Sequence, residues 1–262
     1  MVQLTSVLQL FESVAMFAFW HGANTNREPS FWDIRKIFGE YMFFMATIRC
    51  DIYKEFYQIN SSKHNLDVLI ELSNLSRSSF TLSYTLKARS HPMPYARLDF
   101  VSICIDMSTR KPCPLPPSVR DMFKNHSLQK RLIRRRMEKL IRPQECQTYR
   151  VSIHYTDTDE NQHTHWIAYI RACYNACMAG ILHQKYECIT KDDAVQGIKS
   201  FEITFLKESM IEDDLDVISW TFPYEDGTYI AFDVQKGDQL CCQGKLSFHD
   251  GRSTDDGKNS KL

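Results

Sequence analysis

The chain has 262 residues, of which 43% are hydrophobic and 24% are charged, a composition typical of a folded globular protein rather than a disordered one. Its 32 Lys and Arg residues balance 32 Asp and Glu residues, so no overall charge predicts a nucleic acid or an anionic membrane as partner. The longest apolar runs, such as residues 41–48, are much shorter than the ~20 residues of a membrane-spanning helix, so we expect no membrane span.

The N-terminal segment is apolar enough to raise the question of a secretory signal peptide. It has no basic residues at its start, and Glu12 interrupts the apolar run. Residues 2–20 therefore predict a helix that packs in a core.

Two later segments of the sequence are similar to each other. Each begins with a strand that ends in Lys-Glu and continues through a polar turn into Leu-Asp-Val; these motifs start at Lys54 and Leu66 in the first segment and at Lys207 and Leu215 in the second. Two more strands with period-2 alternation follow in each segment, and a helical pattern precedes each. Because the strand connections are short turns, the strands should be antiparallel. The repeat predicts an α+β protein of two similar domains.

We expect the first domain at residues 1–124, a linker at 125–147, the second domain at 148–250 and a disordered tail at 251–262. The linker has seven Lys or Arg residues between Lys130 and Arg142 and an apolar stripe at helical spacing. This pattern favours a solvated linker helix, although a basic face for phosphate, for an acidic carrier protein or as a nuclear signal is the alternative.

The two domains should differ at their start. A strand pattern at residues 148–156 precedes the helix of the second domain, whereas no such pattern precedes residues 2–20. The first domain is therefore expected to lack its opening strand and any counterpart of the polar turn that follows that strand.

This polar turn, residues 156–165 (TDTDENQHTH), lies directly before an amphipathic helix that starts at Trp166. The free N–H groups and the positive dipole end of a helix N-terminus can stabilise an oxyanion and keep a carboxylate ionised. Asp159 could act there as base or nucleophile, Asn161 could position a water or an amide, and His163 could transfer a proton near neutral pH.

Each of these side chains also has a structural interpretation. Asp159 could be a helix N-cap, Asn161 a loop amide and His163 a hydrogen-bonded histidine at the helix start. Asp157 is expected only to form or cap the turn, and His154 and His165 are assigned no chemical role. The alternation Asp-x-Asn-x-His favours a reactive site over the structural alternative.

The stretch YTDTDENQHTHWIAYI (residues 155–170) resembles the strand-to-helix signature of hotdog-fold thioesterases, and is most similar to the acyl-ACP thioesterases of plants and bacteria. The second hotdog of that family has Asp-x-Asn-Gln-His at its catalytic centre, which Asp159, Asn161 and His163 match. The family also has a Glu-Cys pair on the following strand, where this chain has Glu208 and Ser209. The resemblance implies a tandem (double) hotdog, each domain an antiparallel sheet wrapped around a long central helix.

The resemblance also implies a function. The chain would hydrolyse fatty acyl thioesters of CoA or acyl carrier protein without a metal or another cofactor. Asp159 or Glu208 would activate water or attack directly, Asn161 and His163 would assist, and Ser209, which replaces the family's cysteine, would be auxiliary. His165-Trp166 replaces an Asn-Asn pair, so contacts at the helix start should differ from those of the family.

The acyl chain would lie in a tunnel between the domains. The candidates for its lining are Phe43, Phe44, Met45 and Phe56, although packing in the core is the alternative for each of them. A non-catalytic acyl-binding or scaffold protein is the main alternative function, and an enoyl-CoA hydratase is a less favoured one. A homodimer of such chains is possible.

The cysteines indicate the cellular compartment of the protein. Nine are present, and neither the neighbours Cys241 and Cys242 nor the pair Cys173 and Cys177 has a second pair at zinc-site spacing. Buried thiols in a reducing compartment are the simpler interpretation. The sequence also shows no Ser/Arg-rich transit segment, and the two observations together favour a cytoplasmic protein.

Overall fold

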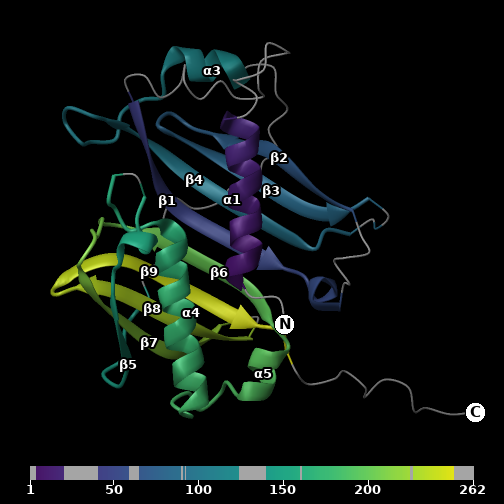
Figure 1. Cartoon of the computed structure of the whole chain (residues 1–262), viewed down its shortest axis with the longest axis vertical. Coiled ribbons are helices and arrows are strands. Elements are labelled where there is room, and N and C mark those ends of the chain that lie inside the picture. The colour runs from purple at the N-terminus through teal and green to yellow at the C-terminus, as the bar shows by residue number, and fades with distance from the viewer. Residues whose placement is uncertain are drawn as a thin grey trace, which may run out of the picture.

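The computed structural model describes residues 4–20, 41–58, 65–89, 91, 93–123, 140–159, 161–224 and 227–250. Within these stretches, two long helices cross one face of a nine-stranded sheet (Figure 1). The first half contains α1 (Leu4–Trp20), β1 (Tyr41–Ile52), η2 (Lys54–Gln58), β2 (Leu66–Leu75), β3 (Ser79–Ala88), β4 (Ala96–Asp106) and α3 (Pro117–Phe123). The second half contains β5 (Gln147–Ser152), η4 (Tyr155–Asp157), α4 (Trp166–Leu182), α5 (Lys191–Val195), β6 (Ile198–Phe205), β7 (Asp214–Tyr224), β8 (Gly227–Lys236) and β9 (Gln239–Phe248).

The sheet is antiparallel throughout, in the order β2-β3-β4-β1-β6-β9-β8-β7-β5. Its order is symmetric about the pair β1 and β6, in which Ile48 lies opposite Ile203. We call this pair the seam. Strands β1 to β4 and β6 to β9 are therefore two copies of one motif, as the sequence repeat predicts. Both β1 and β6 end before the Lys-Glu motif, which lies in the segment that follows each strand.

The two long helices bury their apolar faces against the sheet. In α1 the core positions recur at i, i+3, i+4 and i+7, the spacing of one helix face: Leu4, Val7, Leu8 and Phe11. Helix α4 buries most of its length and begins at Trp166, as expected. The prediction of a core helix at residues 2–20 is confirmed for the part that the structure describes. No helix in the described stretches combines the length and hydropathy needed to cross a membrane.

The halves differ at the outer edges of the sheet. In the second half β5 pairs with β7, with Tyr149 opposite Val217. In the described part of the first half no strand precedes α1, and β2, the counterpart of β7, has only β3 beside it. Among the described residues, the second half therefore has one edge strand that the first half does not.

The expected linker helix falls mostly on residues 125–139, and the expected tail on residues 251–262, both outside the described residues. Residues 140–146 form neither helix nor strand, and β5 begins one residue before the predicted boundary. Here the Leu140 N–H donates to Gln243 Oε1 at 3.3 Å, and Arg142 Nη1 lies 3.8 Å from Asp233 Oδ2. This end of the linker lies against β8 and β9.

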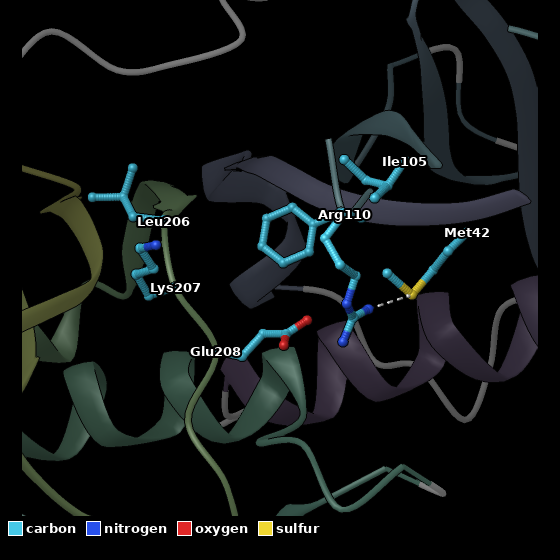
Figure 2. Close-up of a pocket in the computed structure, with 7 residues that line it drawn as sticks. Met42, Ile105, Arg110, Leu206, Lys207 and Glu208 are labelled. Atoms are coloured by element: carbon cyan, nitrogen blue, oxygen red, sulfur yellow. Dashed lines mark hydrogen bonds between the residues drawn. The ribbon is translucent and has the colours of Figure 1, made fainter. Parts of the chain in front are cut away.

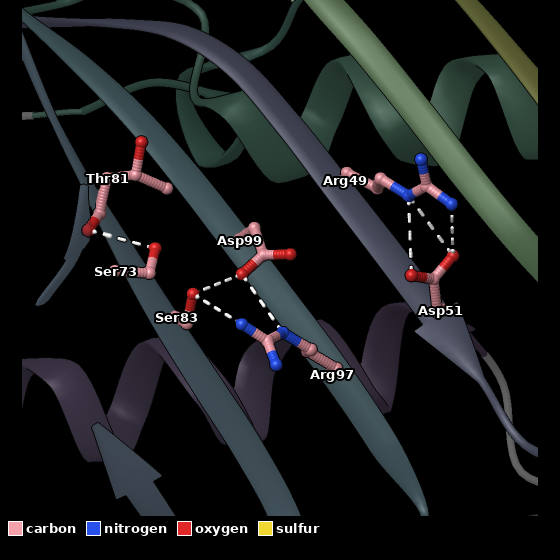
Figure 3. Close-up of polar contacts among 7 residues, drawn as sticks. All are labelled: Arg49, Asp51, Ser73, Thr81, Ser83, Arg97 and Asp99. Atoms are coloured by element: carbon pink, nitrogen blue, oxygen red, sulfur yellow. Dashed lines mark hydrogen bonds and ion pairs between the residues drawn. The ribbon is translucent and has the colours of Figure 1, made fainter. Parts of the chain in front are cut away.

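The face of the sheet turned away from the helices carries polar and charged side chains around β1 and β4 (Figure 3). Asp99 is buried there and accepts hydrogen bonds from Ser83 and, at 3.2 Å, from Arg97 Nε. On β1 the guanidinium of Arg49 pairs with Asp51 at 3.2 Å. Because side chains alternate along a strand, these groups are separated from the apolar face that the helices cover.

Candidate active site

The predicted polar turn forms a closed loop between β5 and α4. A β-bridge between Thr158 and Thr164 closes its base. The backbone reverses at Gln162, whose φ of 62° lies in the left-handed region that few non-glycine residues adopt. The reversal brings Asp159 and His163 to opposite sides of the same loop.

The Asp159 carboxylate organises this loop. Its Oδ1 accepts hydrogen bonds from the N–H of Asn161 at 2.8 Å and from the N–H of His163 at 3.0 Å. The Asp159 N–H donates in turn to the His163 carbonyl at 2.9 Å. Asp159 is therefore fixed by its own turn, and it is not the N-cap of α4, which is His165.

Glu208 reaches the loop through local pairing of the backbone. Residues 162–164 lie antiparallel to residues 209–211, joined by the bridge between His163 and Met210. Glu208 Oε2 lies 3.8 Å from His163 Nε2, with the side chains 37% and 24% exposed. This separation is longer than a hydrogen bond. Catalytic pairs are often loose before substrate binds, so the geometry is compatible with acid–base work.

Ser209 has a different environment from its neighbour. It is 1% exposed, and its Oγ lies 2.6 Å from both Thr164 Oγ1 and Tyr169 Oη. Its N–H also donates to Tyr169 Oη at 3.0 Å. Burial raises the pKa of Tyr169, so this hydroxyl keeps its proton. Ser209 joins the strand side of the site to α4 and does not line the pocket described below.

Asp157 lies in a structural position, as expected. It is buried, accepts from the His154 N–H at 3.0 Å and pairs with Arg171 of α4. The turn and the helix are thereby joined beneath the loop. His154 itself is exposed.

His165 has contacts that the sequence does not predict. Its Nδ1 accepts from the Ile167 N–H at 3.3 Å, so this N–H at the helix start is not free to bind an oxyanion. Its Nε2 lies 2.7 Å from Glu12 Oε1. Since Nδ1 is an acceptor, Nε2 carries the proton and donates to Glu12. His165 therefore connects the start of α4 to α1.

Asp159, Asn161, His163 and Glu208 all line one pocket of about 440 Å³ between the start of α4 and strand β1. Phe43, Phe44 and Met45 form part of its wall, as the expected acyl tunnel requires. Phe56 does not line it: it is buried in η2 against Tyr57, in agreement with the packing alternative. The residues that sequence reasoning missed are Met42, Thr164, His165, Trp166, Tyr169, Phe205 and Lys207.

The cysteines lie outside this pocket and are free thiols. Burial raises the pKa of Cys173, Cys177 and Cys242, which behave as small apolar side chains in the core. In the described part of the chain no three His, Cys, Asp or Glu side chains gather as a possible metal site.

Comparison with known proteins gives matches in structure only. No family model matches the sequence, and no curated protein matches it. Among solved structures, a putative oleoyl thioesterase from Lactobacillus plantarum matches with a TM-score of 0.69 at 11% identity, over 95% of this chain and 90% of that one. The 12:0-ACP thioesterase from Umbellularia californica matches with a TM-score of 0.67 at 12% identity, over 95% and 90%. An acyl-ACP thioesterase from Bacteroides thetaiotaomicron matches with a TM-score of 0.65 at 16% identity, over the same shares.

These matches cover both halves of the chain, and identities this low establish the fold alone. Together with the repeated motif of a long helix on an antiparallel sheet, they define a tandem hotdog protein. The predicted fold class is confirmed.

Proposed function

We propose that this protein hydrolyses fatty acyl thioesters to a free fatty acid and a thiol. The observation that carries the proposal is one pocket in which Asp159, Asn161, His163 and Glu208 face an apolar wall from β1. Such a pocket suits a ligand with an apolar chain and a reactive polar end. The names of the three structural neighbours, an oleoyl thioesterase and two acyl-ACP thioesterases, support the same chemistry.

In this reaction a carboxylate, Asp159 or Glu208, takes a proton from water as the water oxygen attacks the thioester carbonyl. The tetrahedral intermediate collapses, the C–S bond breaks, and the leaving thiolate takes up a proton for which His163 is the nearest candidate. Asn161 orients the water or the carbonyl. The second route is direct attack by a carboxylate, which gives a mixed anhydride that water then hydrolyses.

A single turnover in oxygen-18 water, with protein in excess over substrate, tests for direct attack. A first fatty acid product without the heavy isotope identifies direct attack followed by hydrolysis at the protein carboxyl, because both of its oxygens then come from the substrate and the protein. A labelled product results from water attack on the acyl carbon, either of the thioester or of the anhydride.

The proposal is tested by release of free thiol from medium- and long-chain acyl thioesters of CoA and of acyl carrier protein. We expect turnover by the wild type and a loss of about 100-fold or more in Asp159→Asn, the usual scale for an acid–base group. Asparagine keeps an oxygen that can accept the two N–H bonds of the loop. Asp192→Asn is a matched control, since Asp192 is exposed on α5 and does not line the pocket. Equal activity of Asp159→Asn and wild type would contradict the site.

Two other functions stay as alternatives. A non-catalytic acyl-binding or scaffold protein would bind acyl thioesters without releasing thiol. An enoyl-CoA hydratase would add water across the double bond of crotonyl-CoA or a longer enoyl-CoA and leave the thioester intact. The same assay, with the enoyl absorbance followed in parallel, separates all three.

We further propose a reducing, cytoplasmic setting and a CoA or acyl carrier protein ester as substrate. The nine free cysteines, six of them buried, support the compartment. The names of the neighbours support the carrier class. A dimer of chains remains a prediction.

A further inference from the structure

Two cationic side chains, Arg110 and Lys207, lie in or next to the pocket. A second, smaller hollow of about 230 Å³ adjoins it and shares Met42, Phe44, Lys207 and Glu208 with it. Arg110, from the first half of the chain, completes this second hollow. Figure 2 shows the guanidinium of Arg110 and the carboxylate of Glu208 turned toward each other.

Arg110 is presented by a well-formed turn. It follows β4 in a hairpin closed by a bridge between Ile105 and Pro112. Asp106 Oδ1 accepts from the Thr109 N–H at 2.7 Å and from Ser108 Oγ at 2.6 Å. These hydrogen bonds, chiefly the one from the Ser108 hydroxyl, lower the pKa of Asp106 to about 2. The one acid of the hairpin is thus engaged in the turn.

The charges of Arg110 and Lys207 are not neutralised in the described part of the chain. Arg110 Nη1 contacts Met42 Sδ at 3.6 Å, and neither cation has a carboxylate within ion-pair distance there. Glu208, the acid in the same hollow, has its ion-pair contact with His163 at 3.8 Å. Two cations next to an apolar pocket, and without a carboxylate partner among the described residues, fit an anionic group of a ligand.

We propose that Arg110 and Lys207 bind the phosphate of the phosphopantetheine arm that acyl-CoA and acyl carrier protein share. This inference rests on the proposed thioesterase function and names the part of the substrate that the rim of the site recognises. The two adjoining hollows bring an apolar wall, Glu208 and the two cations together. These three surroundings suit the acyl chain, the thioester and the phosphate of one ligand, joined by a flexible arm that can fold within the hollow.

The proposal is tested with one acyl chain on three thiols: CoA, phosphopantetheine and pantetheine, the last of which has no phosphate. For the wild type we expect kcat/KM on the pantetheine ester to be about 10-fold lower than on the phosphopantetheine ester, the scale of a charge-assisted hydrogen bond. In the double variant Arg110→Gln with Lys207→Gln that difference should disappear. Lys111→Gln is the control, since Lys111 is exposed on the same hairpin but lines neither hollow.

Three results would overturn the proposal. An unchanged preference for phosphate in the double variant means that the cations do not bind it. An equal loss of kcat on all three esters means that Arg110 positions Glu208 and does not bind the phosphate. Loss confined to the CoA ester assigns the cations to the nucleotide phosphates.

Failure of the proposed function itself has a different signature, because no ester would then release thiol. Calorimetric binding of the non-hydrolysable acyl thioethers of phosphopantetheine and pantetheine then decides the phosphate question independently. Tighter binding of the phosphorylated analogue by the wild type but not by the double variant supports the site. Equal binding of both analogues by the wild type rejects it. Unchanged melting temperatures exclude loss of fold as the cause.

Discussion

The two halves of the chain share a motif of four strands and a long helix, yet only the second half carries the candidate chemistry. Glu55 and Glu208 occupy matched places in the repeat, each just after the seam strand of its half. Glu208 meets His163 because the polar turn lies beside it, whereas Glu55 is exposed in η2 and lines no part of the pocket. The same backbone position of the repeat therefore becomes part of the candidate active site only in the half where another segment places partner side chains beside it. The first half provides wall residues and Arg110.

The strongest test of this contrast is to remove the same carboxylate from each half. Glu208→Gln should lower kcat/KM about 100-fold or more, because it removes an acid–base group. Glu55→Gln should leave activity unchanged. Steady-state hydrolysis of one acyl-CoA by both variants gives the comparison, and equal effects of the two would contradict the assignment of chemistry to the second half.

A second test weakens the contact between the halves. Tyr57 of the first half covers Gly197, whose φ is 90°, and a Cβ at Gly197 would lie 2.4 Å from the tyrosine ring. Tyr57 Oη also donates to the Ile198 carbonyl at 2.9 Å, which limits how far the ring can move. Gly197→Ala should lower the free energy of unfolding by about 2 kcal/mol or more.

The control for that variant is Gly237→Ala. Gly237 also has a positive φ, 56°, but a Cβ there meets open space. It should cost only the backbone strain, about 1 kcal/mol. Urea denaturation of both variants measures the difference, and equal losses would mean that the Tyr57 contact adds nothing.

Ser209→Ala separates structural support from chemistry next to Glu208. The buried Ser209 Oγ lies between the Thr164 and Tyr169 hydroxyls, so its removal should lower stability by about 1 kcal/mol. Turnover should change little, because the hydroxyl does not line the pocket. Melting temperature and kcat, measured on the same preparation, test both parts; a large fall in kcat with unchanged stability would give Ser209 a chemical role.

The smallest expected effect is a pH dependence at the seam. His249 Nε2 donates to the Ile52 carbonyl of the first half at 2.9 Å. Burial lowers the pKa of His249, and Lys54 and Lys199 lower it further, whereas Glu55 and the Ile52 hydrogen bond raise it. The unfolded state therefore takes up the proton first, and stability should fall as the pH drops below about 6.5.

His249→Gln should remove that part of the pH dependence, since glutamine can still donate to the carbonyl but does not titrate. Urea denaturation between about pH 7.5 and 5.5 gives the two curves. Parallel curves for the variant and the wild type would show that His249 does not titrate on unfolding.

The fold was accessible from the sequence because it depends on local periodicity. Alternation along β3 and β8, and the helical spacing in α1 and α4, locate the elements, and the repeated Lys-Glu and Leu-Asp-Val motifs relate the halves. The set Asp159, Asn161 and His163 was found for a similar reason, since all three lie within five residues of one turn. The approach of Glu208 came only from the family resemblance.

Contacts between segments that are distant in the sequence could not be predicted from it. The pairing of His165 with Glu12 joins two helices from opposite halves, and no local pattern indicates it. Arg110 lies in an ordinary polar turn of the sequence, and only the packing of β4 beside β1 brings it near Glu208. Ser209 was predicted as an auxiliary site residue because it replaces the family's cysteine; its burial away from the pocket depends on the packing of Tyr169 against it, which the sequence does not indicate.

The seam has one more consequence. Strands β1 and β6 pair continuously from Thr47 opposite Thr204 to Asp51 opposite Ser200, and both belong to the same polypeptide. Were the halves separate chains, the fraction assembled would fall on dilution, as it does for an obligate dimer. Here the effective concentration of one half around the other is set by covalent connection. The pocket between α4 and β1 therefore persists however dilute the protein becomes.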